Sequence, residues 1–238
     1  AMNQDRKPKI ILTRPEPGLT KFSGQLAQNI PSASVYCEAL QSIDFVPNQV
    51  NLERYNGFVF TSSNGVRAAK RWGLPPRTGF GVGHVTTQLA RSYCDPVHDG
   101  GSDVEALLAL ILSMKPAGPL LHIRGQASVG NLATRLSEHG IETHDAIGYE
   151  QNLCVPSNAL MQLLQGGKPM ILPLFSPKSA EILKKLSSDR EHWHVIAMSQ
   201  AVAEIFDAND VLKLDIAQKP NGAAMSNCVA NAWRRYLV

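Results

Sequence analysis

The chain has 238 residues, of which 44% are hydrophobic and 18% are charged, and its formal net charge is +3 at pH 7. This composition predicts a folded chain with room for one large domain or two of ordinary size, and no apolar run approaches the ~18 residues of a membrane-spanning helix. The charge is small, and no Lys/Arg run or aromatic stacking surface accompanies it, so we expect no nucleic-acid partner.

Cysteine usage and the N-terminal segment bear on the compartment. The four cysteines are widely spaced, form no CxxC pair and are expected to be reduced thiols; they are Cys37, Cys94, Cys154 and Cys228. The N-terminal segment lacks the apolar core of a signal peptide. Both features favour a cytoplasmic protein.

His192 and His194 could share one face of a strand, but no third ligand accompanies them, so we expect no metal site.

Short apolar runs alternate with amphipathic segments along the chain. The runs predicted to form strands are residues 9–13, 57–61, 79–83, 120–124, 170–175 and 194–198. The helical stripes that follow three of them are Leu19, Phe22 and Leu26, then Val85, Leu89 and Tyr93, then Leu132 and Leu136 with Gly140 as a C-cap. Parallel strands joined by helices give this alternation, so the sequence predicts an α/β fold with parallel sheets flanked by helices.

The second half of the chain repeats the first in three blocks. VFTSSNGVRAAKRW aligns with LFSPKSAEILKKL, GFGVGHVTTQLA with VIAMSQAVAEIF, and DGGSDVEALLALI with AQKPNGAAMSNCV. The pairs that define the offsets are Phe60 with Phe175 (115 residues), Gly83 with Ser199 (116) and Asp103 with Asn221 (118). Three blocks in one order with nearly constant spacing predict two α/β domains of similar fold.

Two further apolar runs suggest where these domains begin and end. LLHIRG lies between the repeats, and KIILTRP precedes both of them. If LLHIRG completes the sheet of the first repeat, KIILTRP should complete the sheet of the second repeat. The expected parts are an inserted domain of residues 37–151, a discontinuous domain of residues 1–36 plus 152–238, and two crossings near Cys37 and near Tyr149.

Polar residues and glycines mark the carboxyl ends of the predicted strands. They are Thr61, Ser62, Ser63, Asn64, Gly83, Thr86, Arg124, Gly125, Ser176 and Ser199. Ligands of parallel sheets collect beyond the carboxyl ends of strands, where helix N-termini present free N–H groups that suit phosphate or carboxylate. Each of these residues could instead do no more than cap a helix. Five or six such ends, in two domains that face one cleft, could hold a ligand with many anionic groups.

A dinucleotide site is a weaker interpretation of one of these segments. GVGHVT resembles GxGxxG, and Asp103 follows it about twenty residues on. The match lies in mid-domain, and its repeat copy, AMSQAV, contains no glycine. We therefore expect neither a nicotinamide nor a flavin cofactor.

Eight short segments occur in a fixed order along the chain. They are Leu12-Thr13-Arg14-Pro15, TSSNGV, VGHVTT, Arg124-Gly125, Gly148-Tyr149-Glu150, FSPKSA, IAMSQAVAEI and KPNGAAM. Each segment alone is loose, but the ordered set, from about Ile11 to Cys228, resembles the uroporphyrinogen-III synthase family. The departures from the family pattern are Ser199 for a glycine, Val202 for a threonine, Val129 for a basic residue, and Pro173, which implies a bulge or an edge position for its strand.

The resemblance implies an activity. Members of this family are lyases of heme biosynthesis that join the ends of linear hydroxymethylbilane, a tetrapyrrole with eight carboxylates, and invert its last ring, ring D, with loss of water. No metal or other cofactor takes part. The resemblance thus implies a small-molecule substrate, a monomer, no membrane partner and a transient contact with the preceding enzyme of the pathway. The alternative is a non-catalytic two-domain module that binds a small polyanionic ligand.

The resemblance also implies roles for individual residues. Tyr149 is expected to help the terminal hydroxyl leave as water, although it could instead pack at a domain hinge. Arg14 and Arg124 are expected to bind substrate carboxylates, although each could instead form an ion pair within the protein. The residues expected to bind substrate beside them are Thr61 to Asn64, Gly83, Thr86, Gly125, Ser176, Ser199 and Lys219, with Lys178 and Arg67 as weaker candidates. Because two domains joined by two crossings share little interface, we expect the cleft to close on the substrate.

Overall fold

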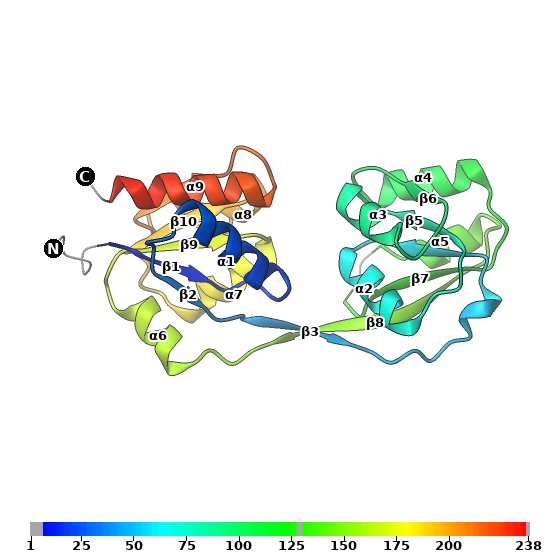
Figure 1. Ribbon diagram of the computed structural model, residues 1–238, viewed down its shortest axis with the longest axis horizontal. Helices are drawn as coiled ribbons and strands as arrows, with labels where there is room; N and C mark the ends of the chain where they lie inside the picture. Colours follow the sequence, from blue (N-terminus) through cyan, green and yellow to red (C-terminus); the bar gives the residue numbers. More distant parts are fainter. Residues whose placement is uncertain (1–6, 128–129, 237–238) are drawn as a thin grey trace. The chain divides into compact units, whose positions relative to one another are not determined.

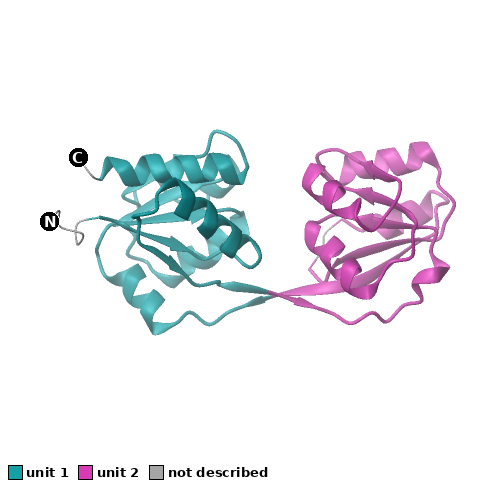
Figure 2. Ribbon diagram, viewed as in Figure 1, with its two compact units in different colours: residues 1–42, 152–238 teal, residues 43–151 magenta. Residues whose placement is uncertain are grey.

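The structure is a computed structural model, and it describes residues 7–127 and 130–236. The chain forms two compact units, the first of residues 1–42 and 152–238 and the second of residues 43–151 (Figure 2). Each unit is a largely parallel sheet flanked by helices, which confirms the predicted α/β fold class. Val129 lies outside the described residues.

The first unit has a five-stranded sheet in which neighbouring strands are parallel (Figure 1). In sheet order the strands are β11 (Lys213–Ile216), β10 (Trp193–Ala197), β9 (Met170–Leu174), β1 (Lys9–Leu12) and β2 (Val35–Cys37). Successive side chains of β1 point to opposite faces, so Ile10 and Leu12 pack with one group of helices and Ile11 with another. The first group is α1 (Gly18–Asn29) and α9 (Gly222–Arg235), and the second is α6 (Asn158–Gln165), α7 (Pro177–Leu186) and α8 (Gln200–Ala203).

The second unit has a six-stranded sheet. In sheet order its strands are β3 (Gln41–Phe45), β8 (Thr143–Leu153), β7 (Leu120–Gly125), β4 (Gly57–Phe60), β5 (Thr78–Gly81) and β6 (Val97–Asp99). Phe58 and Phe60 pack with α2 (Ser63–Trp72) and α3 (His84–Ala90), whereas Val59 faces α4 (Val104–Met114) and α5 (Leu132–Glu138). A short 3-10 helix, Leu52–Arg54, precedes β4. As the repeat predicts, β7 pairs with β4 and β1 pairs with β9.

Helix caps show the repeat in three dimensions. Asp103 and Asn221 both cap a helix by accepting a backbone N–H at 2.8 Å, and Gly83 and Ser199 both stand at N-cap positions. The offsets of 118 and 116 residues are therefore confirmed. The first offset is wrong by one residue, because the helix that follows β4 is capped by Ser62 and the helix that follows β9 is capped by Ser176.

The predicted stripe of Val85, Leu89 and Tyr93 is wrong at its first member, whereas Leu89 and Tyr93 are partly buried and pack against the core of the second unit. Val85 is 72% exposed, and α3 ends at Ala90, before Tyr93. The buried face of α3 carries Thr86, Thr87 and Ala90 instead. Glycine in β5 explains this choice, because the Thr87 methyl carbon lies 2.8 Å from the place that a Cβ at position 81 would take. The helix therefore packs a threonine into the space that Gly81 leaves open.

The expectation that Pro173 marks a bulge or an edge is also wrong. β9 lies in the centre of its sheet, and Pro173 pairs in register with Ile196 of β10. The N–H of Met170 points to the β10 side, where it donates to His192 O at 3.1 Å. Backbone N–H groups alternate in direction along a strand, so the nitrogen of Pro173 faces β1. The ladder with β1 stops at Ile171, so the missing donor interrupts neither ladder.

A buried histidine on β10 lies in surroundings that disfavour its charged form. His194 is 1% exposed; its Nε2 lies 2.7 Å from Asp215 Oδ2 and its Nδ1 lies 3.1 Å from the Tyr236 hydroxyl. Burial lowers the pKa of His194, and the nearby carboxylate of Asp215 offsets only part of that effect. The charges of Lys213 and Arg235 act in the same direction as burial.

We expect acid to destabilise the first unit through this residue. The unfolded chain binds the proton at the ordinary pKa of 6.5 and the folded chain only at a lower pH, so stability falls as pH drops through 6.5 towards the lower value. The slope is at most about 1.4 kcal/mol per pH unit for one proton. Urea unfolding of the native protein and His194→Gln at pH 7.5 and 5.5 measures it. An equal loss in both proteins would contradict the assignment.

Candidate functional site

The predicted residues of the second unit lie at one edge of its sheet. Strands β8, β7, β4 and β5 are parallel neighbours, so their carboxyl ends meet at that edge. The residues that the four ends present are Thr61 to Asn64 after β4, Gly83 after β5, Arg124 and Gly125 at the end of β7, and Tyr149 within β8. Thr86 belongs to the first turns of α3, which begins at this same edge.

Ser62 and Tyr149 form the most closely defined contact of this edge. Ser62 Oγ accepts the N–H of Gly65 at 3.2 Å as the cap of α2, and it lies 2.7 Å from the Tyr149 hydroxyl. Tyr149 is 9% exposed. A register shift between Arg124 and Gly125 brings Gly125 opposite the tyrosine, and a Cβ at position 125 would lie 2.7 Å from the ring. Ser62 is thus both a cap and a partner of the phenol.

Two further hydroxyl and amide groups are held beside this contact. Ser63 Oγ lies 3.3 Å from Thr86 Oγ1, and Asn64 Oδ1 accepts a hydrogen bond from Arg67 Nη1 at 3.0 Å. Gly83 has a φ of +83°, a backbone conformation that favours glycine, and it turns the chain from β5 into α3. The start of α2 and the start of α3 are therefore linked through side chains.

A row of polar side chains crosses three strands at this edge, and sequence reasoning found only part of it. Thr61 Oγ1 lies 3.0 Å from His122 Nε2, and His122 Nδ1 lies 3.2 Å from Asp145 Oδ1. Arg124 Nε lies 3.1 Å from the same carboxylate oxygen, and Arg124 Nη1 donates to Gly125 O at 3.0 Å. Arg124 therefore has the internal ion pair that the sequence left open as an alternative.

The pKa of Asp145 reflects this row. Burial of the carboxyl group works against ionisation, but the contact with His122 and the charge of Arg124 outweigh it and hold the pKa below its ordinary value. Asp145 is therefore a carboxylate at neutral pH. His122 and Asp145 were missed because His122 sits inside an apolar run. The available signal was the i, i+2 spacing of His122 and Arg124, which places both on one face of a strand.

The first unit presents a second set of predicted residues at the carboxyl edge of its own sheet. Arg14 follows β1, and its guanidinium carbon lies 3.8 Å from the centre of the Phe175 ring. A Cβ at position 18 would lie 2.6 Å from the guanidinium, so Gly18 leaves room for it at the start of α1. Burial lowers the pKa of Arg14, with a partial offset from Glu16. Among the described residues, Arg14 has no ion pair.

The remaining predicted residues of the first unit are helix caps and one lysine. Ser176 Oγ accepts the N–H of Ser179 at 3.1 Å at the start of α7. Ser199 caps α8 by accepting the N–H of Val202 at 3.4 Å. The valine that stands at position 202 in place of the family's threonine therefore supplies its backbone N–H to this cap. Lys219 precedes α9 and lines a cavity of about 680 Å³ along that helix, together with Asp215.

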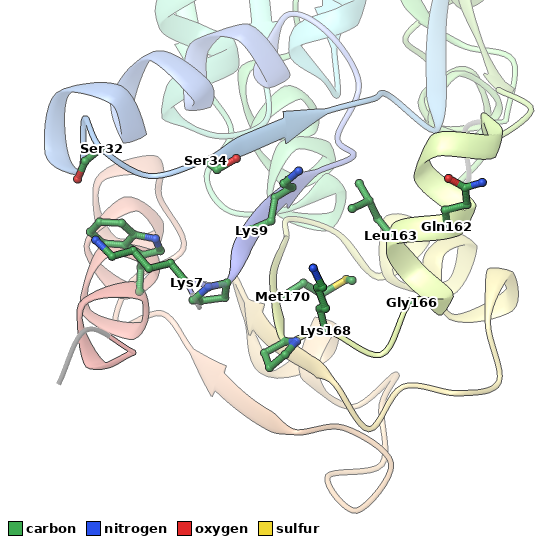
Figure 3. Close-up of a pocket in the computed structure, with 12 residues that line it drawn as sticks. Lys7, Lys9, Ser32, Ser34, Gln162, Leu163, Gly166, Lys168 and Met170 are labelled. Carbon is green, nitrogen blue, oxygen red and sulfur yellow. The ribbon is translucent and has the colours of Figure 1, made fainter. Parts of the chain in front are cut away.

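The hollow shown in Figure 3 lies at the opposite, amino-terminal edge of this sheet and contains none of the predicted residues. It has a volume of about 600 Å³, and Lys7, Lys9 and Lys168 line it. Helices α1, α6 and α9 end near it, at Asn29, Gln165 and Arg235. Helix C-termini carry partial negative charge that cations offset, so the three lysines need no ligand to explain them.

Neither a cluster of metal-ligating side chains nor a membrane-spanning helix occurs among the described residues. No group of three His, Cys, Asp or Glu residues in the described ranges could hold a metal ion. Over those same ranges, no helix combines the length and apolar character needed to span a membrane. His192 Nε2 lies 2.7 Å from Leu164 O, and His194 is occupied by Asp215.

Fold and site together define a two-unit α/β protein whose strand ends present hydroxyl, amide and guanidinium donors suited to carboxylates. The sequence model of one family, Uroporphyrinogen-III synthase HemD, matches residues 26–227. The chain belongs to the uroporphyrinogen-III synthase family.

Solved structures support the fold. A uroporphyrinogen-III synthetase from Helicobacter pylori is 18% identical, with a TM-score of 0.65 over 94% of this chain and 99% of the other. A mutant uroporphyrinogen III synthase from Thermus thermophilus is 16% identical, with a TM-score of 0.58 over 95% of this chain and 99% of the other. No curated protein matches the chain.

Proposed function

We propose that this chain closes linear hydroxymethylbilane into the type III macrocycle, with inversion of ring D and loss of water. The family assignment carries the proposal, because the match spans residues 26–227 and members of the family are cyclising lyases of tetrapyrrole biosynthesis. The donor-rich strand ends support it independently, since a substrate with many carboxylates needs many N–H and O–H partners.

A product assay tests this function. The protein is incubated with freshly made hydroxymethylbilane, the products are oxidised, and the isomers are separated by chromatography. We expect the type III isomer to dominate. Accumulation of only the type I isomer, which forms spontaneously, would contradict the synthase and favour the non-catalytic module that binds a polyanion.

Arg14 is proposed to bind a substrate carboxylate through two parallel N–H donors. Because it has no ion pair among the described residues, Arg14→Ala is expected to raise KM about tenfold or more, since a hydrogen bond to a charged group contributes about 1.5–3 kcal/mol. Arg124→Ala is expected to raise KM less, because the Nε of Arg124 is already paired with the carboxylate of Asp145. Arg91→Ala is the control: Arg91 is exposed and contacts Gln88. An unaltered KM in both the Arg14 and the Arg124 variant would refute the contacts.

Tyr149 is proposed to assist departure of the terminal hydroxyl. Tyr149→Phe keeps the ring that packs on Gly125 and removes the hydroxyl that contacts Ser62. We expect single-turnover closure to slow about tenfold, the value of one hydrogen bond of about 1–1.5 kcal/mol. Tyr55→Phe is a matched control, because Tyr55 is also buried and contacts His144 at 2.9 Å. An unchanged rate and isomer ratio would leave Tyr149 a packing residue.

The other strand-end residues are proposed to contact the rest of the substrate, most of them through its remaining carboxylates. They are Thr61, Ser62, Ser63, Asn64, Gly83, Thr86, Gly125, Ser176, Ser199 and Lys219. The compartment is proposed to be the cytoplasm, which the free thiols of the four cysteines fit. Because the bilane also closes spontaneously, a transient contact with the enzyme that supplies it would limit that loss.

A further inference from the structure

The polar row at the edge of the second unit has the order of a proton relay. His122 pairs in register with Asp145 on one side and with Val59 on the other, so β7 places its imidazole between β8 and β4. The ring is 3% exposed. Its Nε2 faces the Thr61 hydroxyl at 3.0 Å and its Nδ1 faces Asp145 at 3.2 Å.

The surroundings select one tautomer of the His122 ring. Asp145 is a carboxylate and can only accept hydrogen bonds. His122 Nδ1 is buried and forms no well-aligned hydrogen bond with any described residue, so the carboxylate 3.2 Å away is the acceptor that faces it. A neutral ring then carries its hydrogen on Nδ1, and Nε2 accepts the hydrogen of Thr61 Oγ1. This leaves the lone pairs of Thr61 Oγ1 free to face a ligand at the strand edge.

The reaction needs a group that removes a proton from carbon. The water that is lost combines the hydroxyl of one end of the bilane with a hydrogen from the ring carbon at the other end. One proton must therefore reach the departing hydroxyl, and one must leave the free ring carbon of ring D when that carbon forms its new bond. Tyr149 serves the first transfer in the proposed function, and the second transfer needs a different group.

We propose that Thr61 accepts this second proton, with His122 and Asp145 as the residues that position and polarise it. Inversion exchanges the two linkages of ring D: its substituted ring carbon bonds to the methylene of the first ring, the bond from that carbon to the neighbouring methylene breaks, and that methylene then bonds to the free ring carbon. In this last bond formation the carbon–hydrogen bond of the free ring carbon breaks, and its electron pair returns to the pyrrole ring. The proton moves to Thr61 Oγ1 while the hydrogen of that hydroxyl moves to His122 Nε2. Asp145 stabilises the imidazolium and stays ionised, and the proton then passes to water. This inference rests on the proposed function.

His122→Gln tests the relay. The glutamine amide can still contact Thr61 but cannot carry a proton. We expect kcat to fall about 100-fold, the lower range for general base catalysis, with KM unchanged because His122 is buried beneath the edge. The matched control is His144→Gln, since His144 lies nearer the start of β8 and contacts Tyr55 and Glu142. That variant is expected to keep native kcat and KM.

An isotope measurement separates a relay from a structural role. Bilane with deuterium on the ring carbon that loses its hydrogen is compared with unlabelled bilane in single turnovers. A larger isotope effect in His122→Gln than in the native protein is expected, because removal of that proton has become slower. Native kcat and a native isotope effect in the variant would overturn the relay, and so would a slower variant whose isotope effect is unchanged.

A second variant protects the test against misfolding. Thr61→Val removes the hydroxyl at nearly constant size, and urea unfolding checks that each variant keeps the native transition. If His122→Gln does not fold, the kcat and the isotope effect of Thr61→Val decide in its place. The relay and the proposed function fail differently. A native protein that makes no type III isomer refutes the function, whereas type III formation with unaffected variants refutes only the relay.

Discussion

Gly65→Ala is expected to destabilise the second unit by about 1–3 kcal/mol, the usual cost of overpacking a well-packed site. Gly65 lies in the first turn of α2, and a Cβ there would stand 2.5 Å from the backbone oxygen of Ile123 in β7. A backbone atom in a central strand cannot turn aside as a flexible side chain can. The helix must therefore move away from the sheet, and Ser62, which caps it, moves too.

A second glycine-to-alanine change gives the opposite sign. Gly24 lies in α1, is exposed, and has no atom within 4 Å of the place that a Cβ would take. Gly24→Ala is expected to stabilise the first unit by about 0.5–1 kcal/mol, because alanine loses less backbone freedom in a helix. Urea unfolding followed by tryptophan fluorescence measures both, since Trp72 reports the second unit, and Trp193 and Trp233 report the first. Effects of the same sign would contradict the steric argument.

Gly125→Ala is expected to reduce the rate of closure about 100-fold, the scale of a displacement of about 1 Å in an active site. An alanine Cβ would lie 2.7 to 3.0 Å from Cε2, Cζ and the hydroxyl oxygen of Tyr149. The ring has to shift, and its contact with Ser62 at 2.7 Å is then lost. The effect should exceed that of Tyr149→Phe, which leaves the ring in place.

The double variant Gly125→Ala/Tyr149→Phe shows whether the glycine acts through the tyrosine. Residues that act together are not additive, so adding Gly125→Ala to Tyr149→Phe is expected to slow closure only about tenfold, against about 100-fold in the native protein, because the contact of the hydroxyl is already gone and only the shift of the ring remains. Single-turnover closure of the four proteins gives the comparison. Fully additive losses would mean that Gly125 matters for another reason, such as the path of the chain after β7.

The central strands were predictable because they are buried on both faces. KIIL, GFVF and MILPL are made up almost entirely of apolar residues, and nearly all of them are buried. Strands at or near the edges were missed, because β2, β6 and β11 bury only part of their side chains and are three or four residues long. β8 was missed although it lies inside its sheet, since polar residues make up both ends of THDAIGYEQNL and leave only a short apolar stretch, AIGY, between them.

The candidate site was predictable where the local sequence alone determines what a residue does. Small polar residues at strand ends became caps, as Ser62, Ser176 and Ser199 did, because a cap depends only on the next three residues. The relay could not be found this way. Thr61 follows β4, His122 lies in β7 and Asp145 lies in β8, and only the pairing of these strands brings the three side chains into one row. Likewise, the Arg124 side chain looks free in sequence until Asp145 is placed beside it.

The inserted position of the second unit has a consequence for synthesis on the ribosome. All six strands of its sheet have been made once residue 153 has emerged, so this unit can fold early. In the first unit, β1 lies between β2 and β9, and β9 begins only at Met170. Ile10, Ile11 and Phe22 therefore stay exposed, without most of the residues they pack against, while more than a hundred residues are added. Exposed apolar surface of this kind is what chaperones bind, so the N-terminal strand and helix are the segments of the nascent chain with most need of protection.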